Sequence, residues 1–314
     1  MNKLAIIIPY FKVQFFDELL LKLSEQTDKR FNIYIGNDSS REDPIRIINK
    51  YTDKLKIKYK HYNENLGHIC PTLQWNRCLD LISEEEWVWI LPDDDLISEN
   101  CVEEFYKALP EIENQDINVI TIPSQTIDAH GFRQDNLRIN PKIQSVYQFY
   151  LKQLKGESTG SSLGDNIFRR SALLTAGKFF SFPRAWGSDH ATILASSAKS
   201  NIYCLQEAWF GFRQSGLNIS SSNTDGDLKM EARLRFLKWL KNNEYIFNTK
   251  PSIDFYKYFY WKSEYYMLNE WRSSIPIYWT LFQIRKHGLN STNPTPIIKI
   301  IIKKLISRLI PFKY

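Results

Sequence analysis

The feature that most constrains the fold of this chain is an apolar run of strand length that ends in three consecutive carboxylates. Residues 87–91 are apolar throughout, and Asp93, Asp94 and Asp95 follow one residue later. Such a run is typical of a strand that is buried on both faces of a sheet. Adjacent carboxylates repel one another unless a cation, hydrogen-bond donors or bulk water compensates their charge. The stretch therefore predicts either a divalent-metal site or an acidic turn, and the triplet taken alone favours the turn.

Two earlier runs of strand length also end abruptly, at a proline or at a polar turn. Residues 4–8 stop at Pro9, and residues 31–36 lead into the polar turn 37–40. Apolar positions between 15 and 23 have helical spacing, so the segment predicts a strand, a helix and a second, parallel strand. Ligands of open α/β sheets bind at the carboxyl edge of the strands. We therefore expect one pocket formed by the residues after these strands, namely Pro9, Tyr10, Phe11, Asp38, Asp93, Asp94 and Asp95.

Hydrophobic spacing predicts further elements along the chain. Strands are expected at 56–62, 116–122 and 206–212 and just before 171, helices at 69–82, 171–176, 190–198, 228–240 and 253–271, and a polar loop at 125–142. The first apolar run is too short for a signal peptide or a membrane span.

Composition excludes several classes of protein. The chain has 314 residues and a net charge of +6, with ample apolar content for a core. Its four cysteines lack metal-ligand spacing, which predicts reduced thiols in a cytosolic protein. No GxGxxG fingerprint follows the first strand, and no aromatic and basic nucleic-acid module is apparent. We therefore expect neither a dinucleotide-type phosphate loop nor a nucleic-acid partner.

Five motifs in the same order resemble the GT-A glycosyltransferases of family 2, over residues 4 to about 220. They are Ile-Ile-Ile-Pro-Tyr at 6–10, Gln26-Thr27, Asn37-Asp38-Ser39-Ser40, Asn65-Leu66-Gly67 with Asn76, and Leu91-Pro92-Asp93-Asp94-Asp95. The resemblance implies an α/β, Rossmann-like GT-A fold, with a mostly parallel central sheet flanked by helices and followed by a C-terminal helical extension. We expect a catalytic domain at 1–222, with its nucleotide-sugar half at 1–100 and its acceptor half at 101–222.

The resemblance also implies roles for the residues of the donor half. The residue matching Asp38 accepts the uracil N3–H, and the segment of Pro9, Tyr10 and Phe11 packs on the base. The acidic motif, including Asp93 and Asp94, holds the ribose and the metal, although Pro92 stands where the usual Asp-x-Asp-Asp motif begins. Asp95, with Asp93, is the expected ligand of Mn²⁺ or Mg²⁺.

Two residues of the acceptor half receive roles in the same way. Asp189, in Trp186-Gly187-Ser188-Asp189-His190, matches the general base, although it is equally well placed to cap the following helix. His190 is expected to be an ordinary helix residue. Arg213 could clamp the donor diphosphate, or close the end of the sheet with a surface ion pair. Gln214 or Ser215 stands near a histidine that is usual in the family.

The C-terminal part of the chain has a different character. Residues 223–290 predict an aromatic-rich helical extension, for which packing on the catalytic domain is favoured over sugar or lipid contact. Residues 291–314 predict a basic amphipathic tail that lies on an anionic membrane, and the alternative is a buried helix or an oligomer contact.

The sequence thus predicts an inverting glycosyltransferase, peripheral on the inner face of a bacterial cytoplasmic membrane. The expected donor is UDP-glucose or UDP-galactose, and the expected acceptor is a polyprenyl-diphosphate-linked sugar of O-antigen or another surface polysaccharide, joined in β linkage. Alternative donors are UDP-GalNAc, UDP-GlcNAc and dTDP-rhamnose. A sugar nucleotidyltransferase would carry a glycine-rich basic loop after the first strand, which Pro9-Tyr10-Phe11-Lys12 lacks. The alternative to an enzyme is a non-catalytic carbohydrate-binding protein or membrane scaffold.

Overall fold

An eight-stranded, mostly parallel sheet forms the centre of the protein in the computed structural model, which describes residues 2–157, 162–216, 226–255 and 258–259. Its strand order is β3-β2-β1-β4-β9-β6-β10-β8, and only β9 and β8 run antiparallel to their neighbours. The strands are β1 (Leu4–Tyr10), β2 (Phe31–Asn37), β3 (Ile57–His61), β4 (Trp87–Ile90), β6 (Val119–Thr121), β8 (Ile143–Ser145), β9 (Asn166–Arg169) and β10 (Asn201–Cys204).

A second, three-stranded sheet lies beside the carboxyl end of β4. It pairs β5 (Leu96–Ile97), β11 (Phe210–Arg213) and β7 (Ser124–Ile127). The expectation of a polar loop over 125–142 is therefore wrong at its start, because β7 pairs there with β11 in parallel. The strand expected at 206–212 is shorter, and it begins only at Phe210.

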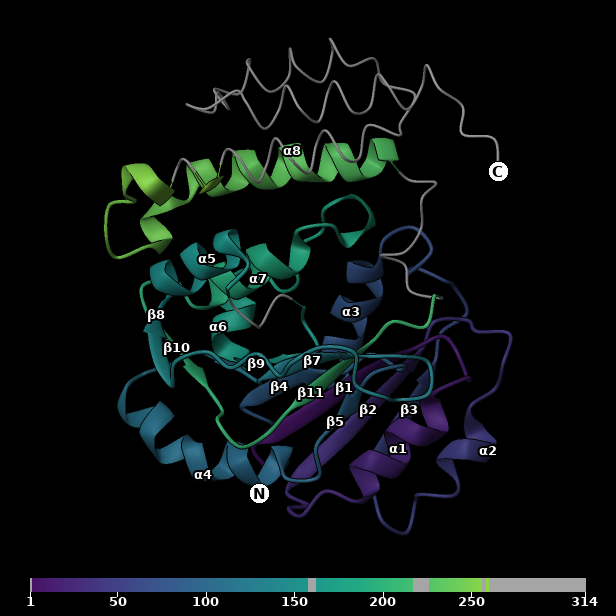
Figure 1. Ribbon diagram of the computed structural model, residues 1–314. Helices are drawn as coiled ribbons and strands as arrows, with labels where there is room; N and C mark the ends of the chain where they lie inside the picture. Colours follow the sequence, from purple (N-terminus) through teal and green to yellow (C-terminus); the bar gives the residue numbers. More distant parts are fainter. Residues whose placement is uncertain (1, 158–161, 217–225, 256–257, 260–314) are drawn as a thin grey trace, which may run out of the picture.

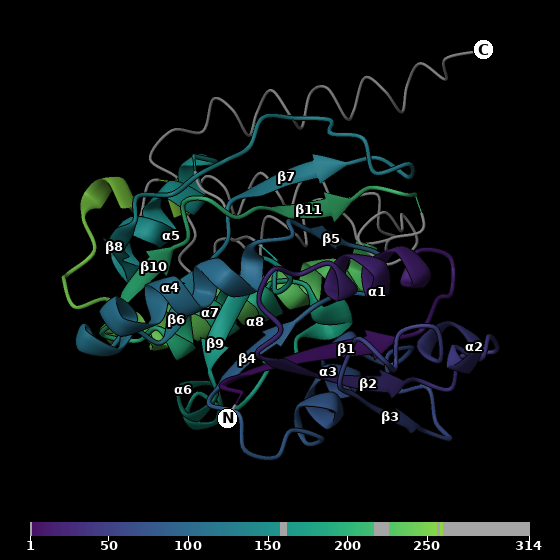
Figure 2. The same ribbon diagram turned by 90° about the horizontal axis from the view of Figure 1, so that it is seen from below.

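Helices cover both faces of the central sheet (Figures 1 and 2). One face carries α1 (Phe16–Ser24), α2 (Ile45–Ile48) and α4 (Cys101–Asn114), and the other carries α3 (Pro71–Leu79), α5 (Val146–Lys155), α6 (Arg170–Thr175) and α7 (Ser188–Ser196). Because side chains alternate along a strand, Ile6 and Ile8 of β1 enter the core under α1 and α4, while Ala5 and Ile7 enter the opposite core. Burial on both faces explains the continuous apolar run of this strand.

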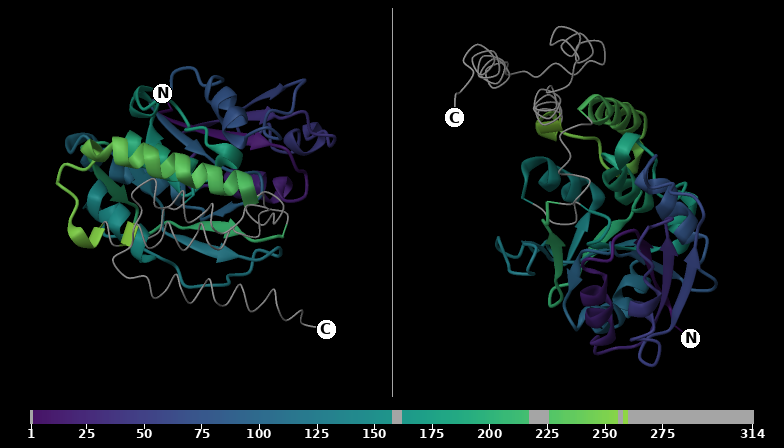
Figure 3. Two further views of the ribbon diagram at one scale, coloured as in Figure 1. Left: turned by 90° about the horizontal axis from the view of Figure 1, so that it is seen from above. Right: turned by 90° about the vertical axis from the view of Figure 1, so that its right-hand side faces the viewer.

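The helix predicted at 228–240 is present as α8 (Gly226–Asn242), which runs across the helices of the second face (Figure 3). Met230, Phe236 and Leu240 are buried in the same core as Ile7. Short 3-10 turns lie at Pro183–Ala185 and Glu244–Ile246. Most of the helix expected at 253–271, and the whole basic tail at 291–314, lie outside the described residues.

All four cysteines are free and buried, as the absence of metal-ligand spacing predicts. Within the part of the chain that the structure describes, no helix is long and apolar enough to cross a membrane.

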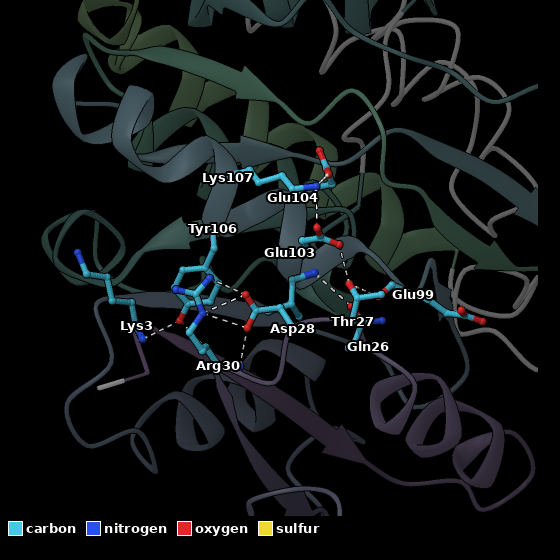
Figure 4. A network of polar contacts seen from close by, with 11 residues as sticks. Lys3, Gln26, Thr27, Asp28, Arg30, Glu99, Glu103, Glu104, Tyr106 and Lys107 are labelled. Atoms are coloured by element: carbon cyan, nitrogen blue, oxygen red, sulfur yellow. Dashed lines mark hydrogen bonds and ion pairs between the residues drawn. The ribbon is translucent and has the colours of Figure 1, made fainter.

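The loop between α1 and β2 is bound to the start of α4 (Figure 4). The side-chain amide of Gln26 donates to the carbonyl of Ser98 at 2.8 Å, and its oxygen accepts from the N–H of Val102 at 3.1 Å. Thr27 donates its N–H to the carbonyl of Glu99 at 2.8 Å and its hydroxyl to Glu103 at 2.9 Å. The Gln26-Thr27 motif therefore fixes the chain just beyond the acidic triplet.

Candidate active site

A cavity of about 680 Å³ opens at the carboxyl edge of β1, β2 and β4. It brings together most of the residues that the sequence singles out. The predicted residues that line it are Pro9, Phe11, Asp38, Asp93, Asp94, Asp95 and Asp189. One cavity thus holds the candidate base-binding, metal-binding and proton-accepting groups.

Backbone N–H groups just after β1 and at the end of β11 hold two carboxylates of the acidic triplet. Oδ2 of Asp93 accepts from the N–H of Phe11 at 2.7 Å and from that of Lys12 at 2.8 Å, just after β1. Oδ1 of Asp95 accepts from the N–H of Arg213 at 2.8 Å, at the end of β11. The second oxygen of each carboxylate takes no part in these bonds and is a candidate ligand atom.

Burial raises the pKa values of all three carboxyl groups, and repulsion by Asp94 adds to the effect at Asp93 and Asp95. Burial, and then the charge of Asp94, raise the pKa of Asp93 to about 7. The same two causes raise the pKa of Asp95 well above its usual range, and Asp165 adds to the repulsion. Burial raises the pKa of Asp94 against the opposing charges of Lys12 and Arg213. A bound cation would offset this repulsion.

The carboxylate oxygens fit a hard divalent ion whose coordination shell is completed by a bound ligand and water. Carboxylate oxygens are the ligands that Mg²⁺ and Mn²⁺ prefer, and such ions are often held by one or two carboxylates plus substrate phosphates and water. Among the described residues, no group of three or more His, Cys, Asp or Glu side chains has the arrangement of a complete metal site. Asp93 and Asp95 would therefore supply only part of the coordination shell.

Asp38 follows β2 and is held by the next loop. Its Oδ1 accepts from the N–H of Leu66 at 2.9 Å, its Oδ2 accepts from the N–H of Gly67 at 2.8 Å, and the guanidinium of Arg77 pairs with it. A Cβ at Gly67 would lie 2.4 Å from Oδ2, so the close approach requires glycine. These three donors leave about one of the roughly four acceptor positions of a carboxylate for a ligand. The Asn65-Leu66-Gly67 motif thus forms the seat of Asp38.

Tyr10 lies between Pro9 and Phe11 but does not line the cavity. Its ring is fully buried with Phe16, at 4.7 Å between ring centroids, and its hydroxyl donates to the carbonyl of Glu42 at 2.9 Å. Burial raises the pKa of the Tyr10 hydroxyl well above its usual range. The side chain belongs to the core under α1.

The guanidinium of Arg213 is fully buried and points into the protein. It donates to the carbonyl of Asp94 at 2.6 Å, to the carbonyl of Ala129 at 2.9 Å and to Glu18 of α1 at 2.7 Å. Arg213 is not among the residues that line the cavity. Its partners in this structure are protein groups that converge on the acidic loop.

Asp189 lies in the first turn of α7, half-buried at the cavity wall. Gly187, with φ 77°, is the N-cap, so the alternative of Asp189 as the cap is wrong. Its Oδ1 accepts from the N–H of His190 at 2.8 Å, at a helix end whose partial positive charge stabilises a carboxylate. The ring of His190 packs between Tyr150 and Phe236, each 6.0 Å away between centroids.

Several further residues that line the cavity received no individual role from the sequence, among them Lys12, Asp165, Arg184 and Trp186. Asp165 precedes β9, which inserts antiparallel between β4 and β6 and so brings its start to the carboxyl edge of β4. No local pattern signals such an insertion. Trp186 did carry a signal, because it stands only three residues before the candidate base.

An open, mostly parallel sheet with an acidic cavity at its carboxyl edge is the architecture of a GT-A glycosyltransferase. The chain matches the family model described as glycosyl transferase family 2 over residues 5–175. It belongs to this family and is a glycosyltransferase. No curated protein sequence matches the chain.

Solved structures of TarS from S. aureus are similar in fold. TarS 1–349 in complex with UDP-GlcNAc has a TM-score of 0.63 and 18% identity, over 85% of this chain and 72% of that one. The same fragment in complex with UDP has a TM-score of 0.53 and 16% identity, over 91% and 89%. The longer TarS structure has a TM-score of 0.55 and 16% identity, and this chain covers 54% of it. At such identities the likeness shows the GT-A fold alone.

Proposed function

We propose that the protein transfers a hexose from UDP-glucose or UDP-galactose to an acceptor hydroxyl with inversion at the anomeric carbon. The observation that carries the proposal is the single cavity that holds Asp38, the acidic triplet and Asp189. These groups correspond in type to the three requirements of the reaction, which are recognition of a nucleotide base, compensation of a diphosphate and removal of a proton.

The donor lies along the edge formed by β1, β2 and β4. Asp38 accepts the uracil N3–H with its remaining acceptor position, and Pro9 and Phe11 pack on the base. The neighbouring Asp93 and Asp94 face the ribose and the diphosphate. The complexes of TarS with UDP and UDP-GlcNAc support a uridine nucleotide in a fold of this kind. The diphosphate contact of Arg213 stays a prediction, since its guanidinium is fully buried and bonded to Asp94, Ala129 and Glu18.

Asp95 and Asp93 would hold the metal through Oδ2 of Asp95 and Oδ1 of Asp93, the oxygens that do not accept these backbone hydrogen bonds. When bound, Mn²⁺ or Mg²⁺ neutralises the negative charge that develops on the leaving UDP. The backbone donors of Phe11, Lys12 and Arg213 orient the two carboxylates before any ligand arrives, which lowers the cost of reorganisation.

Asp189 takes the proton from the acceptor hydroxyl as its oxygen attacks the anomeric carbon from the face opposite to UDP. The bond from that carbon to the diphosphate oxygen breaks, and UDP leaves with the electron pair. One displacement inverts the configuration, so an α-linked donor gives a β-linked product. Asp189 lies in the first turn of α7, where the partial positive charge of the helix end favours a carboxylate.

The proposed acceptor is a sugar on a polyprenyl diphosphate, during assembly of O-antigen or another surface polysaccharide. This part rests on the family resemblance and on the basic sequence at 291–314, which lies outside the described residues. An amphipathic tail with lysines at 299, 303 and 304 is suited to an anionic membrane surface. We therefore propose peripheral attachment at the inner face of the cytoplasmic membrane.

The test is a screen of radiolabelled donors with Mn²⁺ and a GlcNAc-diphosphate-lipid acceptor, with EDTA as control. UDP-glucose, UDP-galactose, UDP-GlcNAc, UDP-GalNAc and dTDP-rhamnose are offered singly. Transfer from UDP-glucose or UDP-galactose that EDTA abolishes is the expected result. Transfer from another donor corrects the sugar, and release of free sugar without transfer rejects the acceptor. Absence of both refutes the proposal.

The two rival functions have their own controls. A nucleotidyltransferase would form a nucleotide sugar from UTP and a hexose 1-phosphate, and β1 is followed by Pro9-Tyr10-Phe11-Lys12 rather than by a glycine-rich basic loop. A scaffold would show no Mn²⁺-dependent rise in melting temperature with UDP.

A further inference from the structure

The segment that carries the candidate base has an unusual backbone. Arg184 and Ala185 have φ values of 54° and 60°, and Gly187 has a φ of 77°, so three of four consecutive residues are left-handed. Residues other than glycine rarely adopt this conformation, and such strain is concentrated where a fold presents side chains to a ligand. Trp186 stands in the middle of this turn and lines the catalytic cavity with Asp189.

Helix α8 supports the turn from behind. It packs against the 3-10 turn Pro183–Ala185, and a Cβ at Gly187 would lie 3.3 Å from the Cβ of Phe236. Two cations one helical turn apart on α8 lie over the indole of Trp186. Nζ of Lys229 is 4.5 Å from the ring centroid, and Cζ of Arg233 is 5.2 Å from it. Lys229 is almost completely buried, so its attraction to the ring is weakly screened.

We propose that Trp186 is the platform on which the acceptor sugar ring stacks, and that Lys229 and Arg233 hold its indole in position. The inference rests on the proposed function and deepens it, because it names the part of the acceptor that is recognised. A pyranose has a face of C–H groups that packs on an aromatic face, while its hydroxyls stay free for polar partners. Stacking on Trp186 would place one hydroxyl of the sugar beside Asp189. The bound acceptor would then be oriented for attack on the anomeric carbon.

The location of Trp186 separates this role from donor binding. The base-binding candidates Pro9 and Asp38 follow β1 and β2, whereas Trp186 belongs to the turn before α7. The family match ends at residue 175, so this turn and α8 both lie beyond it. Loss of the indole should therefore weaken binding of the acceptor and leave binding of the donor unchanged.

The experiment compares Trp186→Leu with Trp239→Leu in the full chain. Trp239 is the matched control because it is also an indole in the α8 neighbourhood, packed on Phe180 at 5.0 Å and on Phe236 at 6.0 Å, and it does not line the catalytic cavity. Steady-state kinetics give the KM of p-nitrophenyl glycosides of glucose, galactose and GlcNAc as acceptors, and the KM of the donor. Saturation-transfer NMR reports binding of the same glycosides in the presence of UDP and Mn²⁺.

Trp186→Leu is expected to raise the acceptor KM by about tenfold, the size of one aromatic contact, while the donor KM changes less than about twofold. Trp186→Phe should recover most of this loss. Lys229→Met should give a smaller rise in the acceptor KM, and Trp239→Leu should give none. If Trp186→Leu unfolds, Trp186→Phe and Lys229→Met carry the comparison.

Three results would overturn the assignment. They are an unchanged acceptor KM in Trp186→Leu, an equal rise in Trp239→Leu, and a wild type that hydrolyses a UDP-hexose but gives no saturation transfer to any glycoside. A wild type that binds the glycosides through Trp186 but uses no UDP-hexose would instead refute the proposed donor and leave the sugar platform in place.

Discussion

At the scale of single residues, the proposed chemistry depends on the carboxylate of Asp189. Asp189→Asn keeps the size of the side chain and removes its basicity, so we expect kcat to fall by about 10²–10⁴-fold. The affinity for UDP, measured by calorimetry with Mn²⁺, should stay within about twofold. Asp80→Asn is the matched control, because Asp80 is an exposed partner of Lys178 and does not line the cavity. Near-normal turnover of Asp189→Asn would remove it from the base role.

Asp93 links the acidic triplet to pH. Its pKa is about 7 in the folded protein, against 3.8 as the ordinary value, so the folded state binds more protons than the unfolded state between these values. Stability of the metal-free protein therefore falls as pH rises through this window. We expect a loss of roughly 1 kcal/mol from this group between pH 6 and 8.

The measurement is the melting temperature of EDTA-treated protein at pH 6 and pH 8, with and without Mn²⁺. Mn²⁺ should restore most of the loss at pH 8, because a cation offsets the repulsion among the carboxylates. Asp93→Asn should have a weaker pH dependence than the wild type, which assigns the difference to Asp93. An identical pH dependence in the variant would contradict the prediction.

Alternation along a strand explains which residues near β1 reach the cavity. Pro9 and Phe11 line it, while Tyr10 between them points into the core. Successive side chains of a strand face opposite sides, so the sequence contains this distinction as soon as β1 is extended to Tyr10. The partners of Arg213 were beyond prediction, since Glu18, Asp94 and Ala129 are distant from it in sequence.

At the scale of elements, the long apolar runs were predictable and the short strands were not. β1, β2 and β4 are buried on both faces, and their sequences are apolar accordingly. β7 reads Ser-Gln-Thr-Ile and exists because it pairs with β11, which lies more than eighty residues away. Helix α4 was missing from the sequence prediction, although its buried Val102, Phe105, Leu109 and Ile112 have helical spacing.

Arg213 ties α1, β11 and the acidic loop together, and this link can be measured. Arg213→Met leaves the carbonyls of Asp94 and Ala129 without a strong donor and removes the partner of Glu18. We expect the free energy of unfolding to fall by about 3–5 kcal/mol, as when one partner of a buried ionic network is removed. Urea unfolding provides the measurement.

Glu18→Gln is the control for the link through Arg213. Its amide oxygen still accepts from the guanidinium, and Glu18 is partly exposed, so the loss should be about 1 kcal/mol or less. Equal effects of Arg213→Met and Glu18→Gln would show that the carbonyl contacts contribute nothing.

At the scale of the whole molecule, α8 shares the core of the catalytic sheet. Phe236 and Leu240 belong to the same cluster as Ile7 and Val88 of the central strands. We therefore expect α8, which lies beyond the domain boundary predicted at 222, to unfold together with the catalytic domain. We expect coincident urea transitions by circular dichroism and by tryptophan fluorescence.

Phe236→Ala tests this cooperativity directly. Loss of a buried aromatic side chain should lower the free energy of unfolding of the single transition by about 3–5 kcal/mol. Tyr245→Ala, at a side chain that is 63% exposed, should change it little. A separate early transition that Phe236→Ala alone shifts would mark residues 223–290 as an independent unit.

The antiparallel insertion of β9 has an evolutionary consequence. Because β9 runs against its neighbours, residues 162–165 just before it, rather than the residues after it, lie at the carboxyl edge beside the acidic triplet. Residues 162–165 follow β1, β2 and β4 in the chain and take no part in the parallel pairing of these strands. If the proposed division into donor and acceptor sides holds, insertions or exchanges at these residues would change the choice of acceptor without disturbing the parallel strands, so related proteins could diversify their products with little loss of stability.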